Sequence, residues 1–413
     1  MRFVPILKKI ILGLFMVVIL VAGYKDSVEN PIDFAVYHGI GKQLLHGNFD
    51  LYPKELYTLT EEPSFSQING MYYRYAPVTA LLFVPFALFD LATAGFLFFL
   101  LKIAALFGVV LMISKITGVK SDRYLTVGLI AFFSVAGYIV EEWHVGNVHF
   151  LSFFLIVLAI YGIEKGRVVW PSFLLALAVA LKITPLLFVF YFLVKKKFKV
   201  CAVVAVSLAV LFLLPALFVG FEKNAVLVKE WSMSAAQKSE ASVNHSLKGV
   251  LFKYLNHNDI DGPKYPKTNV ADFSRETVYA LWLGLWLATM IFLAAIFARA
   301  SRHPDVVLLE HSLVVAGILI LSPHSMRPYF STLLLPSGIL VILLIKYSQN
   351  IYRRLMQGVL VLSFLVSVLI PAVLPGRQAS LVYEIHSPYF FATTILFFVL
   401  VFLIRNFEKL NPA

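Results

Sequence analysis

The sequence predicts an all-α integral membrane protein, a multi-pass helical bundle of about 12 transmembrane helices. Hydrophobic residues make up 60% of its 413 residues and charged residues 14%, whereas soluble domains average roughly 45–50% and 25%. The apolar residues come in runs of the length that crosses a bilayer, and short basic clusters separate these runs. No water-soluble fold could bury this excess, so the chain is expected to span a membrane.

Ten apolar runs are candidate spans. They are 10–24, 93–114, 124–140, 148–163, 200–219, 277–298, 306–321, 329–346, 355–372 and 388–404. The first run follows a basic segment and no A-x-A cleavage site comes after it, so it is expected to remain as a signal-anchor. The stretch 168–194 is apolar except for Lys182-Ile183-Thr184-Pro185. Two short spans hinged at Lys182 would return the chain to the same side, which gives 12 spans with both termini in the cytoplasm.

The charge distribution supports this topology in a cytoplasmic or inner cell membrane. With the N terminus inside, 19 Lys and Arg residues fall on the cytoplasmic side and 14 outside, while Asp and Glu divide into 4 inside and 18 outside. Most of the outer basic residues lie in long loops, where the positive-inside rule has little force. The net charge of +12 is therefore interpreted as an orientation signal, and no nucleic-acid partner is expected.

Two long loops dominate the predicted extracytoplasmic side, at residues 25–92 and 220–276, within a single transmembrane domain over 1–413. The first loop contains an apolar stretch, 76–89, that is too short for a comfortable span and is expected to form an interfacial helix. The one cysteine, Cys201, excludes an intrachain disulfide and a cysteine-based metal cage.

Asp33 follows the first predicted span and Pro31. Pro31 favours a helix start, and an acidic residue in the first turn of a helix is stabilised by the helix dipole, which is a sufficient structural reason for it. The functional alternative is a carboxylate at the rim of a membrane cavity that takes a proton from an incoming hydroxyl.

Several tyrosines and Arg74 cluster further along the first loop. The tyrosines are Tyr52, Tyr57, Tyr72, Tyr73 and Tyr75. Most of them are expected to form an interfacial aromatic belt. Because sugars bind against aromatic rings, part of the set is a candidate acceptor site.

Lys182 is the most costly residue of the chain if it lies at the centre of a span, by roughly 2.5–3.5 kcal/mol on insertion scales. At the hinge of two short spans it lies at the outer surface instead. Either position calls for an anion, which is an internal carboxylate in the structural interpretation and a lipid phosphate in the functional one.

The segment Glu141 to His149 holds two carboxylates and two histidines, His144 and His149, in nine residues. A metal site or acid–base chemistry is one interpretation, and the other, preferred for Glu141 and Glu142, is a solvated outer loop. Gly146 beside Asn147 allows the backbone to approach a ligand closely.

The remaining candidates are Asn244-His245 in the second long loop and the proline-flanked turn that carries His324 and Arg327. Each is as compatible with a structural role as with a functional one, but all the polar groups fall on one predicted face of the membrane. No nucleotide-binding pattern occurs, and the cytoplasmic loops are too short for a nucleotide domain. An enzyme of this kind would take an activated substrate from the lipid phase, and a polyprenyl-phosphate sugar meets that requirement.

An ordered set of motifs runs through residues 30–330. They are Asp33-Phe34-x-Val36-Tyr37, Leu51-Tyr52, Tyr73-x-Tyr75-Ala76-Pro77, Gly146-Asn147-Val148, Lys182-Ile183-Thr184-Pro185, Asn244-His245-Ser246-Leu247 and Leu321-Ser322-Pro323-x-Ser325. This set resembles the GT-C glycosyltransferase family 87 (the DUF2029 group), which includes polyprenyl-phosphomannose-dependent α-mannosyltransferases. The chain departs from the family pattern at Asn147 and His245, where glutamine is usual, and at Met326-Arg327-Pro328.

The resemblance implies a GT-C-type fold and an inverting transfer of a hexose, with mannose as the default, that needs neither metal nor cofactor. Asp33 would be the general base, and Lys182, helped by Arg327 and His324, would bind the donor phosphate. The substrate-binding residues it implies are Tyr37, Tyr52, Tyr73, Tyr75, His144, Asn147, Asn244 and His245. The partners would be a polyprenyl-phosphate sugar, a glycolipid or lipid-linked acceptor, and membrane lipids.

Three other functions fit the sequence. The first is a different GT-C enzyme, such as a lipid-linked glycan ligase or an aminosugar transferase. The second is a lipid or solute transporter, although transporters usually show repeats and polar residues in broken helices at the midplane, and only 168–194 has that character. The third is an inactive partner in envelope assembly.

Overall fold

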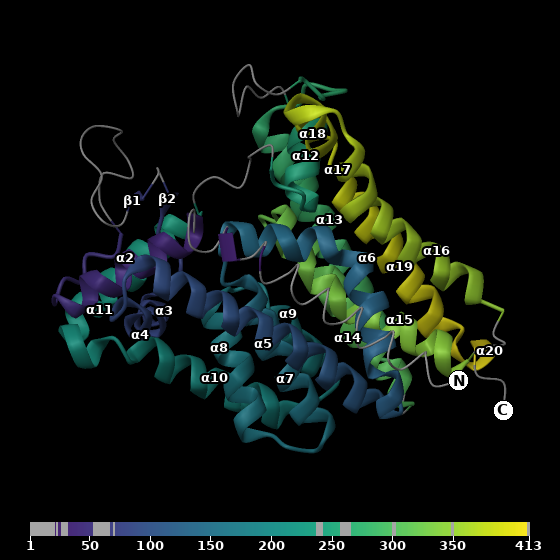
Figure 1. Ribbon diagram of the computed structural model, residues 1–413, viewed down its shortest axis with the longest axis horizontal. Helices are drawn as coiled ribbons and strands as arrows, with labels where there is room; N and C mark the ends of the chain where they lie inside the picture. The colour runs from purple at the N-terminus through teal and green to yellow at the C-terminus, as the bar shows by residue number, and fades with distance from the viewer. Residues whose placement is uncertain are drawn as a thin grey trace. The chain divides into compact units, whose positions relative to one another are not determined.

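The computed structural model of the protein describes residues 21, 24–25, 32–52, 67–68, 71–236, 243–256, 266–299, 303–347 and 351–410. These residues are helical apart from connecting segments and one hairpin of two-residue strands, β1 (Gln67–Ile68) and β2 (Met71–Tyr72) (Figure 1). The chain forms two compact units. Unit 1 comprises 1–105, 140–148 and 212–235, and unit 2 comprises 106–139, 149–211 and 236–413.

Unit 1 is built around α2, which carries Asp33. Its helices are α2 (Ile32–Leu45), α3 (Pro77–Ala80), η2 (Leu81–Phe83), α4 (Val84–Ala87), the first part of α5 (Leu91–Thr117), the end of α6 (Tyr124–Val145) and most of α11 (Ala216–Ala236). α2 packs on η2 and α4 through a buried face. At Gly41 a Cβ would lie 2.7 Å from the Phe83 carbonyl oxygen, so this close approach of the helices requires glycine.

Unit 2 holds the second part of α5 together with the remaining helices. They are η3 (Ser121–Arg123), the first part of α6, α7 (His149–Glu164), α8 (Val169–Leu181), α9 (Leu186–Val194), α10 (Phe198–Leu213), α12 (Leu247–Leu255), α13 (Arg275–Phe297), α14 (Pro304–Leu321), η5 (Arg327–Leu333), α15 (Leu334–Lys346), α16 (Arg353–Phe364), η6 (Leu365–Leu369), α17 (Ile370–Val373), α18 (Gly376–Ile385), α19 (Pro388–Arg405) and α20 (Phe407–Leu410). α14 packs on α9, α15 and α19, and α14 and α15 are the most buried of the long apolar helices, so they form the centre of this unit.

Within the described residues, seven helices are long and apolar enough to cross a membrane, or eight if the bent pair α10–α11 is one span. The chain is therefore a multi-pass membrane protein, but the predicted count of about 12 is not confirmed. The first predicted span, 10–24, lies almost entirely outside the described residues. The run 148–163 became α7, whose 16 residues reach only about 24 Å, and the run 200–219 is bent by 95°.

The structure confirms that the stretch 168–194 is broken at Lys182. α8 and α9, of 13 and 9 residues, flank the break. Their lengths of about 20 and 14 Å are below the roughly 30 Å of a hydrocarbon core. At the far end of α9 the Lys197 ammonium lies 3.2 Å from the Glu164 carboxylate at the end of α7. α8 and α9 therefore run between the same two ends of the unit as α7.

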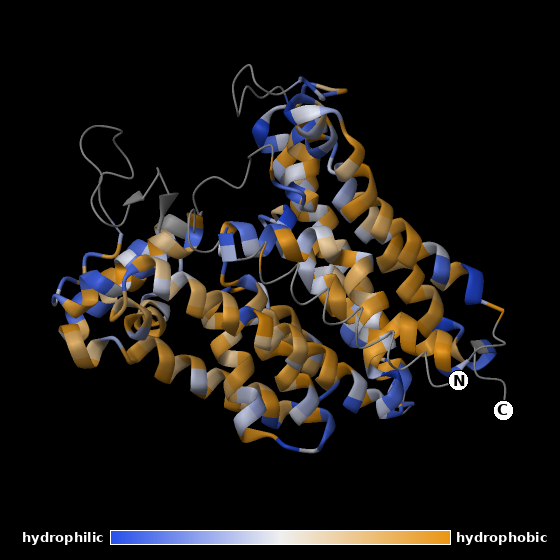
Figure 2. Cartoon of the chain, viewed as in Figure 1, coloured by the Kyte–Doolittle hydropathy of each residue, from blue (hydrophilic) through white to orange (hydrophobic). Residues whose placement is uncertain are grey.

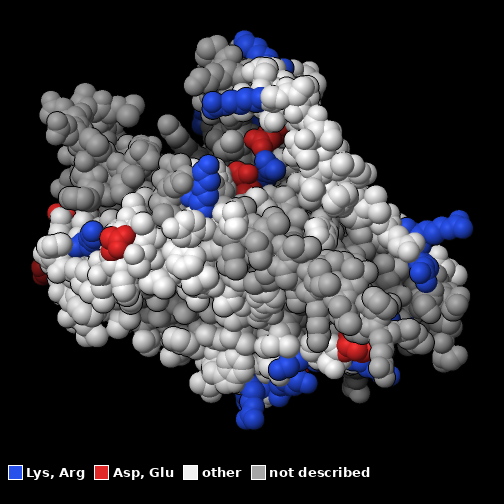
Figure 3. All heavy atoms as spheres, in the orientation of Figure 1, with Lys and Arg blue, Asp and Glu red and all other residues white. Residues whose placement is uncertain are grey.

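The two segments predicted to be long loops contain helices of their own. The first holds α2, α3, η2 and α4, and the apolar helix over Pro77–Ala87 is too short to span, as the sequence predicted. The second includes most of α11 and all of α12. Figure 2 shows hydrophobic residues along the middle of the long helices and hydrophilic ones at their ends. Figure 3 shows the charged side chains of the described residues in separate patches.

Candidate active site

Asp33 occupies the first turn of α2, as the sequence predicted. Its Oδ2 accepts a hydrogen bond of 2.6 Å from the side-chain amide of Asn147, a residue 114 positions later. An amide that donates to one carboxylate oxygen orients the group and stabilises its charged form. The structure thus brings together two of the predicted site residues, a candidate base and a polar side chain that holds it.

Asn147 is placed by the way α6 ends. Gly146 has φ +69°, its N–H donates to the Trp143 carbonyl (3.1 Å), and the Asn147 N–H donates to the Glu142 carbonyl (3.4 Å). This is the hydrogen-bond pattern of a glycine-terminated helix, and it favours glycine because of the left-handed φ. A Cβ at Gly146 would also lie 3.1 Å from the Phe34 Cβ, so the start of α2 sits directly on the end of α6.

The expectation of a solvated outer loop at Glu141 and Glu142 is wrong for Glu142. α6 continues to Val145, so both residues are helical, and Glu142 is fully buried, with its carboxylate 3.1 Å from the Lys102 ammonium. The sequence does not predict this ion pair, because the two residues lie 40 positions apart. The available signal was a lysine inside a predicted span, which needs a partner.

Two of the tyrosines expected to form an interfacial belt, Tyr52 and Tyr73, are at most 5% exposed, whereas Tyr75 is half-buried. Tyr57 and the side chain of Tyr72 lie outside the described residues. The hydroxyls of Tyr37 and Tyr75 are 2.8 Å apart, and the Tyr52 hydroxyl donates to the Tyr75 carbonyl. Burial raises the pKa values of Tyr52 and Tyr73 above their ordinary value, so both phenols stay protonated. The rings of Tyr37, Tyr52, Tyr73 and Tyr75 also pack on one another, so these tyrosines form a packed aromatic cluster in unit 1.

Lys182 lies in unit 2, in the break between α8 and α9. Its ammonium is 2.8 Å from the centre of the Tyr329 ring, and the His149 ring packs on the same tyrosine with 4.6 Å between ring centres. A cation over an aromatic face is stabilised by the ring quadrupole. The cluster of Lys182, Tyr329 and His149 therefore holds a positive charge in a fixed place, and a positive charge attracts an anionic ligand.

Asn244 fixes the turn after α14. Its side-chain oxygen accepts from the backbone N–H groups of Ser246 (3.0 Å) and Ser325 (2.9 Å), and its amide donates to the Pro323 carbonyl (2.9 Å). These contacts give Asn244 a positioning role, in which it joins the segment before α12 to the segment that carries the predicted ligands His324 and Arg327.

His245 is buried beside the turn that begins α19. Its Nδ1 is 3.3 Å from the Ser387 hydroxyl, to which the Lys253 ammonium donates at 2.6 Å. Ser387 is one of the two described non-glycine residues with positive φ (+53°). Burial, reinforced by the charges of Lys253, His324 and Arg327, holds the pKa of His245 well below its ordinary value, so this histidine is neutral near pH 7.

Arg327 forms an ion pair with Glu384, with 3.2 Å between Nη1 and Oε1. Its guanidinium also lies 5.8 Å from the centre of the Tyr389 ring. Lys253, Ser387 and Glu384 were not predicted. Lys253 lies in α12, whereas His245 precedes this helix. Glu384 and Ser387 flank the turn between α18 and α19. Nothing in the sequence indicates that the loop at 386–387 would return to His245.

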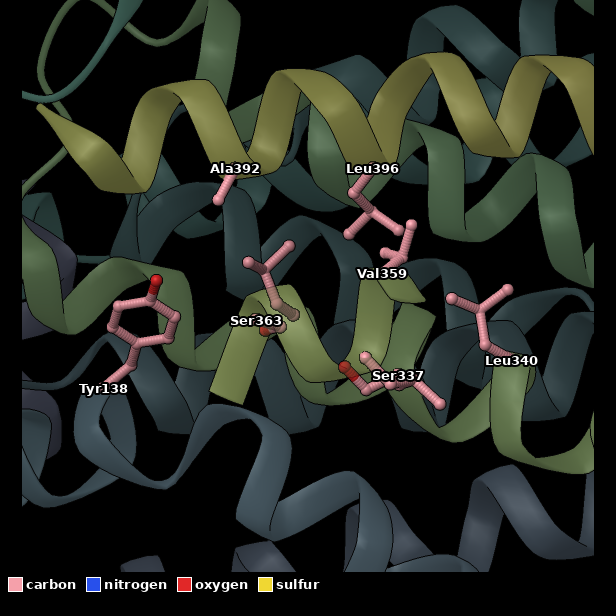
Figure 4. A pocket seen from close by; sticks show the side chains of 9 residues that line it. Tyr138, Ser337, Leu340, Val359, Ser363, Ala392 and Leu396 are labelled. Carbon is pink, nitrogen blue, oxygen red and sulfur yellow. The ribbon is translucent and has the colours of Figure 1, made fainter. Parts of the chain in front are cut away.

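A small pocket elsewhere in unit 2 has a different character. Its lining residues are Tyr138, Leu333, Ser337, Leu340, Val359, Leu360, Ser363, Ala392 and Leu396 (Figure 4). They come from α6, η5, α15, α16 and α19. The lining offers hydroxyl groups and apolar side chains but no carboxylate and no cation, so it is not suited to acid–base chemistry or to phosphate binding.

The fold and the polar groups define a class, an all-helical multi-pass membrane protein with a positioned carboxylate in unit 1 and cationic clusters at one end of unit 2. Residues 73–323, more than half of the chain, match glycosyltransferase family 87. The chain therefore belongs to this family of membrane-embedded glycosyltransferases. The match includes Asn147, Lys182 and Asn244, whereas Asp33, His324 and Arg327 lie outside it. No curated protein matches the chain.

Proposed function

We propose that the protein transfers a hexose, with mannose as the first choice, from polyprenyl phosphate to a glycolipid or lipid-linked acceptor. The transfer takes place on the extracytoplasmic face, inverts the anomeric centre and uses neither metal nor cofactor. Membership of glycosyltransferase family 87 gives the reaction class. The observation that supports a base-catalysed transfer by this chain is the hydrogen bond of 2.6 Å from Asn147 to Asp33, because a base must be held in a fixed orientation.

The reaction assigns one task to each cluster. The acceptor hydroxyl attacks the anomeric carbon, the bond between this carbon and the phosphate oxygen breaks, and the hydroxyl proton passes to the Asp33 carboxylate. Negative charge then grows on the departing polyprenyl phosphate, and the Lys182 ammonium stabilises it. The excess of Lys and Arg on the predicted inner side supports the predicted orientation, in which Asp33 and Lys182 lie on the extracytoplasmic side.

Replacing Asp33 tests this proposal. Asp33→Asn keeps the size and an acceptor for Asn147 but removes the base, so transfer should fall about 10²- to 10⁴-fold. The assay uses the purified protein in lipid nanodiscs, radiolabelled polyprenyl-phosphomannose and a glycolipid extract of the source membrane as acceptor. Asp50→Asn is the matched control, because Asp50 is an exposed carboxylate of the same unit, 3.4 Å from Lys223.

Two outcomes contradict different parts of the proposal. A normal transfer rate for Asp33→Asn, with the control also normal, would show that another group is the base. If the wild-type protein fails with every polyprenyl-phosphohexose but accepts a diphosphate-linked glycan, the donor class is wrong while the family assignment stands.

A further inference from the structure

Unit 1 contains a buried ion pair at the end of α6, next to the residue that binds the candidate base. Lys102 of α5 and Glu142 of α6 are 1% and 0% exposed, with 3.1 Å between the ammonium nitrogen and Oε2. Taking two charges out of water costs several kcal/mol per ion before their attraction is counted, so a buried pair often adds little net stability. Its presence therefore calls for a reason other than stability alone.

The contacts of Lys102 extend beyond the carboxylate. Its ammonium also donates to the backbone carbonyls of Glu142 (3.0 Å) and Asn147 (3.4 Å). The last carbonyls of a helix have no partner within the helix, and a cation is favourable at this end of the helix dipole. Lys102 thus fixes the end of α6 at the point where the chain turns to Asn147.

The same turn carries the hydrogen bond to the base. Asn147 donates its side-chain amide to Asp33 at 2.6 Å, and Lys102 is also close enough to Asp33 for their charges to interact. Lys102 is thus linked to the Asp33 carboxylate in two ways. One is the series of hydrogen bonds through Asn147, and the other is the attraction between the Lys102 and Asp33 charges.

We propose that Lys102 and Glu142 are positioning residues for Asp33. Lys102 holds Asn147 in place and favours the deprotonated, negatively charged form of Asp33. Glu142 holds Lys102 in place, but its own negative charge disfavours that form of Asp33. The inference rests on the proposed role of Asp33. A purely structural pair would not change the proton affinity of Asp33. In the proposed role Lys102 lowers this affinity and Glu142 raises it.

Other titratable groups around the start of α2 are few in the described part of unit 1. α6 also contributes Glu141 and His144 in its last turns, and Tyr73 and Tyr75 precede α3. The short helices packed on α2, over Pro77–Ala87, contain no titratable side chain. Among these groups Lys102 and Glu142 form a buried ion pair, so replacing one member or the other changes the buried charge in opposite directions.

The test is the pH–rate profile of transfer by the full-length protein in nanodiscs. A base must be deprotonated, so the rate rises with pH along the acidic limb. Lys102→Met removes a positive charge and should move this limb to higher pH, and Glu142→Gln removes a negative charge and should move it to lower pH. Each shift should be on the order of one pH unit. In both variants kcat should also fall about 10- to 100-fold through misplacement of Asp33, with donor KM within about 2-fold of wild type.

Matched controls come from the buried pair of Lys195 and Glu310 in unit 2, with 2.6 Å between its charged groups. Lys195→Met and Glu310→Gln make the same chemical changes and should leave the acidic limb in place. If Lys102→Met folds poorly, Lys102→Arg keeps the charge and should return the limb to the wild-type pH, while Glu142→Gln, which is isosteric, still tests the opposite sign.

Limbs that stay in place in both variants, or that move in the same direction, would overturn the inference. The result for Asp33→Asn separates this failure from a failure of the proposed function. If Asp33→Asn is inactive and the limbs do not move, Asp33 remains the base and the pair is structural. If Asp33→Asn is active, the base itself is misassigned.

Discussion

The two ends of the helical bundle in unit 2 hold their cations with different partners. Where α7, α9 and α14 meet, Lys195 lies 2.6 Å from the carboxylate of Glu310 and Lys197 lies 3.2 Å from that of Glu164. Tyr191 donates a further hydrogen bond to Glu310 at 3.0 Å. A carboxylate from another helix neutralises each of these two cations, so the ion pairs at this end, the paired end, hold α7, α9 and α14 together.

At the opposite end the described contacts are of another kind. Lys182 lies over the Tyr329 ring and Lys253 donates to the Ser387 hydroxyl, while Arg327 pairs with Glu384. At the paired end carboxylates hold the cations, whereas at the opposite end the contacts also include a ring and a hydroxyl. If the cations at the opposite end bind the donor phosphate, as we propose, replacements should lower stability at the paired end and raise donor KM at the opposite end.

The largest expected effect is a loss of stability at the paired end. Glu310→Leu leaves the Lys195 ammonium and the Tyr191 hydroxyl without their buried acceptor, and such a change costs about 3–5 kcal/mol of folding free energy. The apparent melting temperature in detergent should fall strongly, whereas kcat and donor KM of the folded fraction should stay close to wild type.

The double variant Lys195→Met with Glu310→Leu is the control for this prediction. Because it removes both charges and leaves apolar side chains of similar size, it should recover most of the lost stability. A single variant that keeps the wild-type melting temperature but loses activity would reverse the assignment of the two ends.

The second prediction concerns donor binding at the end of unit 2 that holds Lys182. Lys182→Met removes the ammonium over Tyr329, and a hydrogen bond to a charged group is worth about 1.5–3 kcal/mol. Donor KM should therefore rise about 10- to 100-fold while the melting temperature changes little. Steady-state kinetics with polyprenyl-phosphomannose measure this effect.

Lys165→Met is the matched control for Lys182→Met, because Lys165 also faces a tyrosine, with 5.9 Å to the centre of the Tyr161 ring, but lies beyond α7 at the paired end. Its donor KM should equal that of the wild type. Equal effects of the two lysines, or an unchanged KM for Lys182→Met, would mean that the cation over Tyr329 has no part in donor binding.

The sequence predicted the elements that local residues determine. A proline and a lysine inside an apolar stretch were enough to place the break between α8 and α9 at Lys182, and a proline before Asp33 indicated a helix start. The number of spans was not predictable in the same way. The lengths of α7, α8 and α9 are below the bilayer thickness, and hydrophobic composition alone does not show where each helix ends.

The site was predicted less completely, because its contacts join residues far apart in the chain. Asp33 and Asn147 were both selected, but their hydrogen bond spans 114 positions. Glu142 was predicted to be solvated, which is wrong. The residues around it indicate neither that α6 continues to Val145 nor that Lys102 lies next to its carboxylate. Lys253 and Ser387 were missed for the same reason, since a separation of 134 residues leaves no periodic pattern.

The smallest expected effect concerns His245, whose protonation adds a charge to the end that already holds Lys253, His324 and Arg327. Its pKa is lowered in the folded protein by burial first and by these charges second. The unfolded chain, with a pKa near 6.5, therefore binds more protons than the folded one as the pH falls below about 6.5. The stability that this difference contributes is fully present above pH 6.5 and is lost as the pH falls toward the lowered value.

His245→Gln removes this titration, and glutamine is the residue that the resemblance to the family leads us to expect at this position. The slope of unfolding free energy against pH should decrease below pH 6.5 by at most about 1.4 kcal/mol per pH unit, the value for one proton. Melting curves of both proteins between pH 5 and 8 measure the difference. Curves that run parallel would show that His245 titrates alike in the folded and unfolded chains, and that the cationic end does not act on it. If the melting temperatures of the two proteins differ only at low pH, and transfer is retained at pH 7, protonation of His245 beside Lys253 and Arg327 is what destabilises the wild type at low pH.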